Sequence, residues 1–158
     1  FKKGQSISKS NATAGNVPVI AGGKTSPYSH NKSNRDGLTI TISSSGAYAG
    51  YVNIFDKPIF VSDAFTVHSK KEKIDQYFLY FYLKSKQKKI YDFQRGAAIP
   101  HVYSSDIQDL KIPIPSLIDQ KKIVKKLISE RDLIEKNKSL VIEFEKKISR
   151  SISKVWKI

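Results

Sequence analysis

The C-terminal third of the chain contains the feature that most restricts its fold. After Pro113 and Pro115, the sequence runs from Ser116 to its last residue without another proline or glycine. Proline lacks an amide donor and biases the residue before it toward extended geometry, so a helix can begin only after the second proline. Ser116 is placed to cap that helix, with Asp119 as its acidic partner three residues later. We predict one helix of about 40 residues, which is about 60 Å long at 1.5 Å per residue.

Apolar residues recur along this stretch at alternating steps of four and three, the heptad pattern of a coiled coil. We call this row the seam, and it comprises Ile123, Leu127, Ile134, Val141, Phe144, Ile148 and Val155. A small domain attached at one end cannot cover a helix of this length, so the seam predicts a partner helix. The alternative is a helix that folds back onto its own domain, which such length without internal caps disfavours.

The chain is strongly basic along its whole length, with a net charge of +14. Residues 1–111 hold 16 Lys and Arg against 8 Asp and Glu, and residues 112–158 hold 12 against 6. A field of this sign favours polyanions, chiefly nucleic acid, through neutralisation of phosphates and release of counterions. A lysine-rich solvated surface, or attraction to an acidic lipid surface, is the alternative interpretation.

Composition also excludes several classes of protein. The chain has no cysteine, which excludes a disulfide framework and a thiolate metal site. No apolar run approaches the roughly 18 residues needed to cross a membrane and no signal-peptide pattern opens the chain, so we expect a soluble, cytoplasmic protein without membrane contact. The chain has no methionine and opens with Phe1, from which we expect its natural start to lie upstream.

Residues 1–112 predict a small α+β domain with a mixed, mainly antiparallel sheet and short helices. Alternating apolar and polar residues, or short apolar runs between turn residues, indicate the strands. They are Val17–Ala21, Leu38–Ser43, Tyr51–Phe55 and Ile59–His68. The alternation in the second of these indicates a half-buried strand, and the close succession of the last three predicts a meander.

Helices are predicted after the strands. Residues 69–93 contain a helix whose aromatic first half must pack inside the domain, because helical spacing accounts for all of its aromatics. Its far end carries lysines that we expect to be exposed, namely Lys84, Lys86, Lys88 and Lys89. A single helical turn is predicted over Ser105–Leu110, where Ser105 and Gln108 match a capping box.

Glycine-containing loops present polar side chains suited to nucleic acid. Gly22 and Gly23 lead into Lys24, Thr25, Ser26 and Tyr28, which are donors or stacking groups. This spacing is not that of a P-loop, and an ordinary surface loop is the alternative interpretation. Polar residues flank Gly96 on both sides. Gln94 and Arg95, two residue types that can read bases, precede it, and His101, Tyr103 and Ser104 follow it.

In this order, the segments resemble the specificity subunit of type I restriction-modification systems, as one target recognition domain and the conserved helix that follows it. The matching segments are Lys3-Gly4, VPVIAGGKTSPYS, LTITISSSGAYAGYV, PIFVSDAFTV, DQYFLYFYLKS and RGAAIPHVYSSDIQDLKIPIPSLIDQKKIV. They cover essentially the whole chain. The last is the most specific, because I-P-x-P-x-L-x-x-Q opens the long helix.

The resemblance implies a non-catalytic subunit that reads double-stranded DNA. Subunits of this family carry two recognition domains, each reading half of a split target, held apart by two antiparallel helices. This chain has one recognition domain, residues 1–112, and one spacer helix, residues 113–158, so the resemblance implies either a second domain in the same polypeptide or a homodimer through the helix. The implied partners are methyltransferase subunits, which would hold S-adenosylmethionine, and restriction subunits. No cofactor is expected in this chain.

We hypothesise that lysines anchor the domain on phosphates while loop side chains read bases in the major groove. The phosphate candidates are Lys9, Lys24, Lys32, Lys84 and Lys88. Loops flanking a rigid sheet suit variable recognition, and the base candidates taken from them are Ser26, Tyr28, Ser44, Ser45, Tyr48, Gln94, Arg95, His101 and Tyr103.

Other function classes stay open. A nonspecific nucleic-acid or membrane-surface adaptor with a coiled-coil helix would bind every sequence alike, with the same salt dependence. A hydrolase would use Asp63 with His68 or His101, yet no G-x-S-x-G elbow surrounds any serine. The sequence also lacks an N-P-P-F methylation motif and a nuclease carboxylate cluster, so no catalytic or metal-binding residue is assigned.

Overall fold

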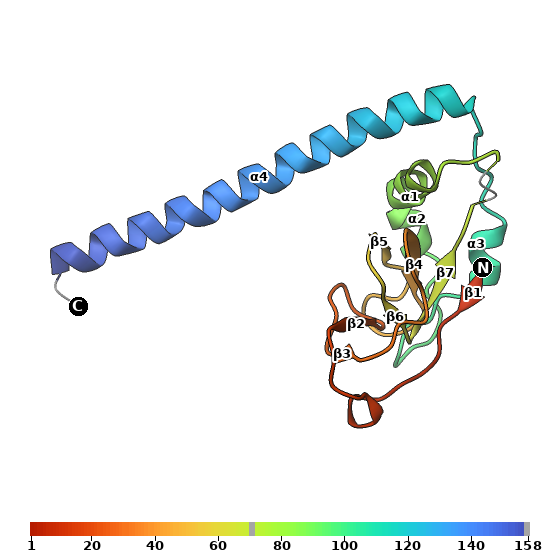
Figure 1. The fold of residues 1–158 in the computed structure, drawn as a ribbon, viewed down its shortest axis with the longest axis horizontal. Helices are drawn as coiled ribbons and strands as arrows, with labels where there is room; N and C mark the ends of the chain where they lie inside the picture. Colours follow the sequence, from red (N-terminus) through yellow and green to blue (C-terminus); the bar gives the residue numbers. More distant parts are fainter. Residues whose placement is uncertain (70–71, 157–158) are drawn as a thin grey trace. The chain divides into compact units, whose positions relative to one another are not determined.

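A computed structural model of the chain describes residues 1–69 and 72–156 (Figure 1). The chain divides into two compact units, Phe1–Gln120 and Lys121–Ile158. This division falls after Gln120 rather than after residue 112, because the first turn of the long helix packs within the first unit. In the described parts of the chain, no helix combines the length and apolar composition that a membrane crossing requires.

Two small sheets form the framework of the first unit. The larger is antiparallel throughout and has the order β1 (Lys2–Lys3), β7 (Ala64–Val67), β4 (Thr39–Ser43) and β5 (Val52–Phe55). The smaller has the order β3 (Ser29–His30), β2 (Val17–Ile20) and β6 (Phe60–Val61). In it β2 pairs antiparallel with β3 and parallel with β6. The predicted mixed, mainly antiparallel α+β architecture is confirmed.

The single strand predicted over Ile59–His68 is wrong. The segment is divided between β6 and β7, which belong to different sheets. The chain passes from one sheet to the other at Ser62 and Asp63. The N-terminal segment is hydrogen-bonded next to this point, where Gly4 N donates to Ala64 O at 2.8 Å. The predicted meander is wrong too, because β7 pairs with β4 on the edge opposite β5.

Strand β4 is buried on both faces, whereas the alternation predicted burial of only one. All of its residues are buried, including Thr39, Thr41 and Ser43. Thr41 lies opposite Thr66, whose hydroxyl accepts a hydrogen bond from Nε of the buried Arg35 at 3.3 Å. Arg35 therefore covers the polar face of the sheet, and desolvation by burial lowers the pKa of its guanidinium.

The helix predicted within residues 69–93 consists of two helices, α1 (Gln76–Ser85) and α2 (Gln87–Tyr91), joined at Lys86. The Asp75 carboxylate caps α1 by accepting from Phe78 N at 3.0 Å. The aromatic first half packs inward as predicted, beside β4 and β5 (Figure 1). The core it joins includes Ile40, Ile42, Val52, Phe65, Leu79, Tyr80, Leu83, Ile90, Val102 and Ile107.

Carboxamide side chains take the place of backbone partners where elements meet. Each accepts from a backbone N–H through its oxygen and donates to a carbonyl through its nitrogen. We call these residues the amide clamps, and they are Asn34 on Val61, Gln76 on Ser69 and Val67, Gln87 on Val52 and Gly50, and Gln120 on Asp75, Lys73 and Pro115. Gln87 directly follows the break between α1 and α2, so its bonds tie the start of α2 to the first residue of β5 and to the loop before it.

The long C-terminal helix is confirmed. Helix α4 spans Leu117–Trp156, which is 40 residues. The Ser116 hydroxyl accepts from Asp119 N at 3.2 Å and donates to the Asp119 carboxylate at 2.6 Å, as its cap position predicted. Leu127 of the seam is partly buried. The other seam side chains are exposed, from 41% for Ile123 to 76% for Val155.

Candidate nucleic-acid interface

Two loops of the first unit are held together by backbone hydrogen bonds. Residues 44–50 lie between β4 and β5, and residues 94–103 lie between α2 and α3 (Ser104–Gln108). Gly46 N donates to Pro100 O at 3.0 Å, and Val102 N donates to Ser44 O at 3.0 Å. These bonds place on one paired surface all the predicted base-contacting residues except Ser26 and Tyr28.

The glycine turn before Ser26 and Tyr28 approaches the same loops. A Cβ added at Gly22 would lie 2.3 Å from Ser45 O, so only glycine permits this approach. Two residues further on, Lys24 Nζ lies 4.6 Å from the centroid of the Tyr48 ring. We call residues 22–28, 44–50 and 94–103 the loop cluster.

Several side chains predicted to contact bases already have partners within the fold. The Tyr28 hydroxyl donates to Ile7 O at 2.5 Å, and Ser26 Oγ donates to Tyr28 O at 2.7 Å. Gln94 Nε2 donates to Ala49 O at 2.8 Å, and the Ser45 hydroxyl donates to the Asp63 carboxylate. These contacts shape the loops. That the same side chains also contact bases stays a prediction.

Besides Ser26, the exposed candidates are aromatic or cationic. Tyr48 and Tyr103 are 42% and 52% exposed, and the Arg95 side chain is 66% exposed. The His101 ring stacks on Tyr103 with centroids 6.3 Å apart. Such groups can stack on bases or donate in a fork to guanine, so the loop cluster has the chemistry of a base-reading surface.

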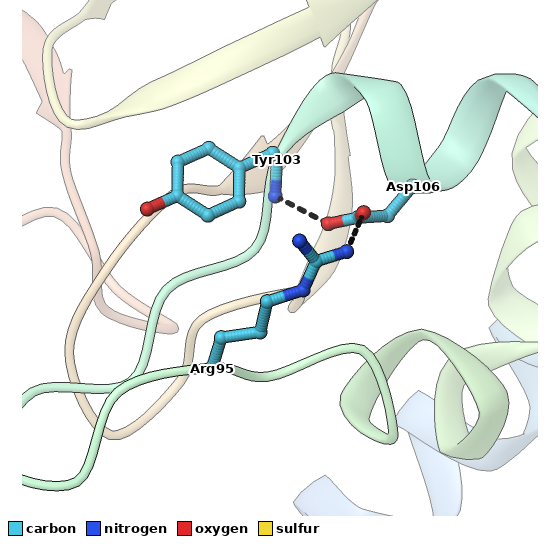
Figure 2. Close-up of polar contacts among 3 residues, drawn as sticks. All are labelled: Arg95, Tyr103 and Asp106. Atoms are coloured by element: carbon cyan, nitrogen blue, oxygen red, sulfur yellow. Dashed lines mark hydrogen bonds and ion pairs between the residues drawn. The ribbon is translucent and has the colours of Figure 1, made fainter.

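The N-terminus of α3 connects to Arg95 through Asp106 (Figure 2). One oxygen of the Asp106 carboxylate accepts from Tyr103 N at 3.1 Å, and the other forms an ion pair with Nη2 of Arg95. The predicted capping box of Ser105 and Gln108 is therefore wrong, because the helix begins one residue earlier and Asp106 closes it. Asp106 was not predicted from the sequence, although its place three residues after Tyr103 fits a capping carboxylate.

A lysine and tyrosine group adjoins the loop cluster. Lys84 Nζ lies 3.9 Å from the Tyr51 ring centroid and donates to Val52 O at 2.8 Å. Lys84 is thus partly buried and not exposed as predicted, and burial followed by the charge of Lys24 lowers its pKa. Burial, followed by the phenols of Tyr51 and Tyr48, raises the pKa of Tyr91. Neither Tyr51 nor Tyr91 was predicted from the sequence as a site residue.

The other phosphate candidates are exposed. Lys86, Lys88 and Lys89 lie on the solvent side around α2 as predicted, and Lys24 is exposed on its turn. Lys9 lies on an exposed 3-10 turn, and Lys32 lines a separate cavity of about 550 Å³ together with Ser8 and Asn11. Their contact with phosphates stays a prediction.

Of the two pairs considered for hydrolysis, Asp63 with His101 shares a cavity and Asp63 with His68 does not. Asp63 and His101 line one of about 560 Å³, whereas His68 lines another. Burial, then Arg35, the N-terminus and Lys2, lower the pKa of His68. The remaining histidine, His30, is buried with its ring perpendicular to that of Phe60. Residues 1–69 and 72–156 contain no cluster of His, Cys, Asp and Glu fit to hold a metal ion.

The backbone conformation of Gly96 provides a test of how closely residues 94–103 fold back on themselves. Its φ is +104°, and a Cβ there would lie 2.6 Å from Ile99 O. Gly96→Ala should destabilise the first unit by about 2 kcal/mol, since both the conformation and the contact oppose a side chain. Gly46→Ala is the matched control with φ +83° and open space around the Cβ, and should cost about 1 kcal/mol. Urea denaturation measures both, and equal losses would contradict the close contact.

The sequence matches the family model described as type I restriction modification DNA specificity domain over residues 1–144. It is 32% identical over 114 residues to the specificity subunit of type I restriction enzyme MjaIX from Methanocaldococcus jannaschii, covering 71% of this chain and 26% of that protein. The structure is similar to the crystal structure of a type I restriction-modification S subunit from M. genitalium, with TM-score 0.76, 27% identity and coverage of 85% of this chain and 37% of that one.

A second similar structure describes complex assembly and conformational transition of the type I restriction-modification system. It has TM-score 0.67 and 21% identity, and the match covers 93% of this chain and 39% of that one, which supports the fold alone. The chain spans well under half the length of each of these proteins. The family match covers most of the sequence and agrees with the fold, so the chain belongs to the type I restriction-modification DNA specificity domain family.

Proposed function

We propose that this chain reads one half of a split target in double-stranded DNA for a type I restriction-modification complex. Family membership supports a role in DNA sequence specificity. The observation that carries the finer proposal is the loop cluster, in which exposed Tyr48, Arg95 and Tyr103 converge through long-range backbone pairing. The alternative adaptor needs no such convergence.

The proposed reading mechanism divides the work between charges and loops. Lys24 and Lys88, both exposed, neutralise phosphates and position the domain without reading sequence. The loop cluster enters the major groove, where Arg95 meets the O6 and N7 acceptors of guanine. Lys84 is partly buried, donates to Val52 O and lies over the Tyr51 ring. From this position it supports the phosphate-facing surface.

The proposed partners act around this reader. Methyltransferase subunits would hold S-adenosylmethionine and perform the methylation, and restriction subunits would join them, so this chain is proposed to be non-catalytic and to need no cofactor. The exposed seam of α4 would pack on a second helix, supplied either by another recognition domain of the same polypeptide or by a second copy of this chain.

Selection from a randomised duplex library tests the function. We expect the purified chain, alone or with its methyltransferase subunit, to enrich a short sequence shared by the bound duplexes. Binding to all duplexes should weaken with salt, because phosphate contacts release counterions, while the enriched sequence keeps its advantage. A nonspecific adaptor would enrich nothing, and its affinity would fall equally with salt for every duplex.

Arg95→Ala should relax the selected sequence at one position. Loss of a forked contact to guanine lowers discrimination there by about 1–3 kcal/mol, which is about 5- to 150-fold. Repeating the selection with this variant measures the change. Lys88→Ala is the control: it should weaken binding uniformly and reduce the salt slope by about 1. An unaltered target preference for Arg95→Ala would contradict the base-reading role.

A further inference from the structure

We propose that Asp106 is a positioning residue that orients Arg95 for guanine, so that specificity at one base pair depends on a carboxylate that does not itself touch DNA. The inference rests on the proposed function of the loop cluster and adds a residue to it. Figure 2 shows the guanidinium of Arg95 directed at the carboxylate of Asp106, which also approaches the backbone nitrogen of Tyr103.

The carboxylate is held in place from its own side. Its side chain is only 7% exposed, and one of its oxygens is occupied by Tyr103 N at 3.1 Å. It belongs to α3, which is anchored in the core by Ile107 at 3% exposure. A carboxylate fixed by a helix terminus and a buried neighbour gives the guanidinium a stationary acceptor.

The Arg95 side chain is fixed where it leaves the backbone, and its guanidinium keeps donors for a base. Arg95 and His101 exchange backbone hydrogen bonds of 2.9 and 2.8 Å, which fixes the base of the side chain. The Tyr103 ring lies 6.0 Å from the Arg95 guanidinium carbon and restricts its swing. Arginine has five N–H donors and Asp106 engages Nη2, so further donors remain for O6 and N7 of a guanine.

The benefit of such an arrangement is preorganisation. An arginine that is mostly exposed loses much side-chain freedom when it docks on a base, and a contact formed beforehand removes part of that cost. An ion pair with one exposed partner adds little to folding stability, so the contact acts mainly on orientation. Without it, the same arginine would still attract phosphates but would discriminate bases poorly.

Asp106→Asn is the variant that isolates this role. Asparagine keeps a carbonyl oxygen for Tyr103 N, while its amide nitrogen cannot accept from Arg95. In the duplex selection, we expect the base preference at the position relaxed by Arg95→Ala to fall by about tenfold and other positions to hold. Affinity for a scrambled duplex should stay level or rise, because the variant loses a negative charge.

Asp109→Asn supplies the matched control, since it makes the same charge change at an exposed position at the end of the same helix. It should leave the preference unchanged. A double variant of Arg95→Ala with Asp106→Asn should lose no more preference than Arg95→Ala alone, because the two residues act through one contact. Thermal unfolding of each variant checks that the first unit remains folded. Asp106→Glu moves the carboxylate while keeping its charge, and it should also relax the preference.

The outcomes separate this proposal from the proposed function. If the unaltered chain enriches no sequence, the proposed function fails. If Arg95→Ala relaxes one position while Asp106→Asn preserves or sharpens it, the function stands and Asp106 does not orient Arg95. Additive losses in the double variant would likewise overturn the positioning role.

Discussion

Replacing Gln120 with leucine should destabilise the first unit by about 4 kcal/mol. The Gln120 side chain is fully buried, and all three of its hydrogen bonds go to backbone atoms. Its oxygen accepts from Asp75 N at 2.8 Å, and its nitrogen donates to Lys73 O and Pro115 O at 2.9 Å. Leucine fills a similar volume but leaves these backbone groups without partners, each at about 1–3 kcal/mol when buried. The substitution also removes the partner of the Asp75 backbone N–H, and Asp75 is the residue whose side chain caps α1.

Urea denaturation followed by the near-ultraviolet circular dichroism of tyrosine measures this loss, because the only tryptophan, Trp156, belongs to the second unit. Gln108→Leu is the matched control on the exposed side of α3, and should change stability by no more than about 0.5 kcal/mol. Gln120→Glu keeps the shape and an acceptor but loses both donors, so it should resemble the leucine variant. Near-wild-type stability of Gln120→Leu would show that water replaces the clamp.

Aspartate at both Ile134 and Val141 should weaken self-association of the chain about 1000-fold. These seam residues are 52% and 56% exposed, and we expect them to become buried against the proposed partner helix. Each apolar side chain contributes about 1.5–3 kcal/mol when buried, and a buried charge adds a desolvation cost. Sedimentation equilibrium over micromolar concentrations gives the association constant.

Aspartate at Ser129 and Ser139 is the control pair, because it makes the same charge change on exposed positions away from the seam. This variant should associate as the unaltered chain does. If the unaltered chain is monomeric at every concentration, the seam does not pair with a second copy. If both double variants weaken association equally, net charge rather than seam packing drives it.

Local signals predicted the parts of the fold that depend on neighbours in sequence. The cap at Ser116, the 40-residue length of α4 and the inward aromatics of α1 are confirmed because helix rules act within a few residues. Pairing between distant segments could not be predicted in this way. An apolar run gives no sign that β6 and β7 join different sheets, and the alternation of β4 gives none that Arg35 covers its polar face.

The same difference between local signals and long-range pairing applies to the candidate nucleic-acid interface. Polar loops containing glycine were identifiable from residue types, and the structure brings most of them together. The state of single side chains was not identifiable: Lys84 is partly buried because it meets Tyr51 and Val52, more than thirty residues away in sequence. Asp106 acquires its importance only once the fold places Arg95 beside it.

The pairing of residues 44–50 with residues 94–103 has a consequence for engineering new specificities. Gly46 with Pro100, and Ser44 with Val102, are joined through main-chain atoms, so the two segments share one conformation. A graft that imports only one segment from a relative would meet a mismatched neighbour. The two should therefore be transplanted as a single cassette, within which individual side chains can be varied without disturbing the scaffold.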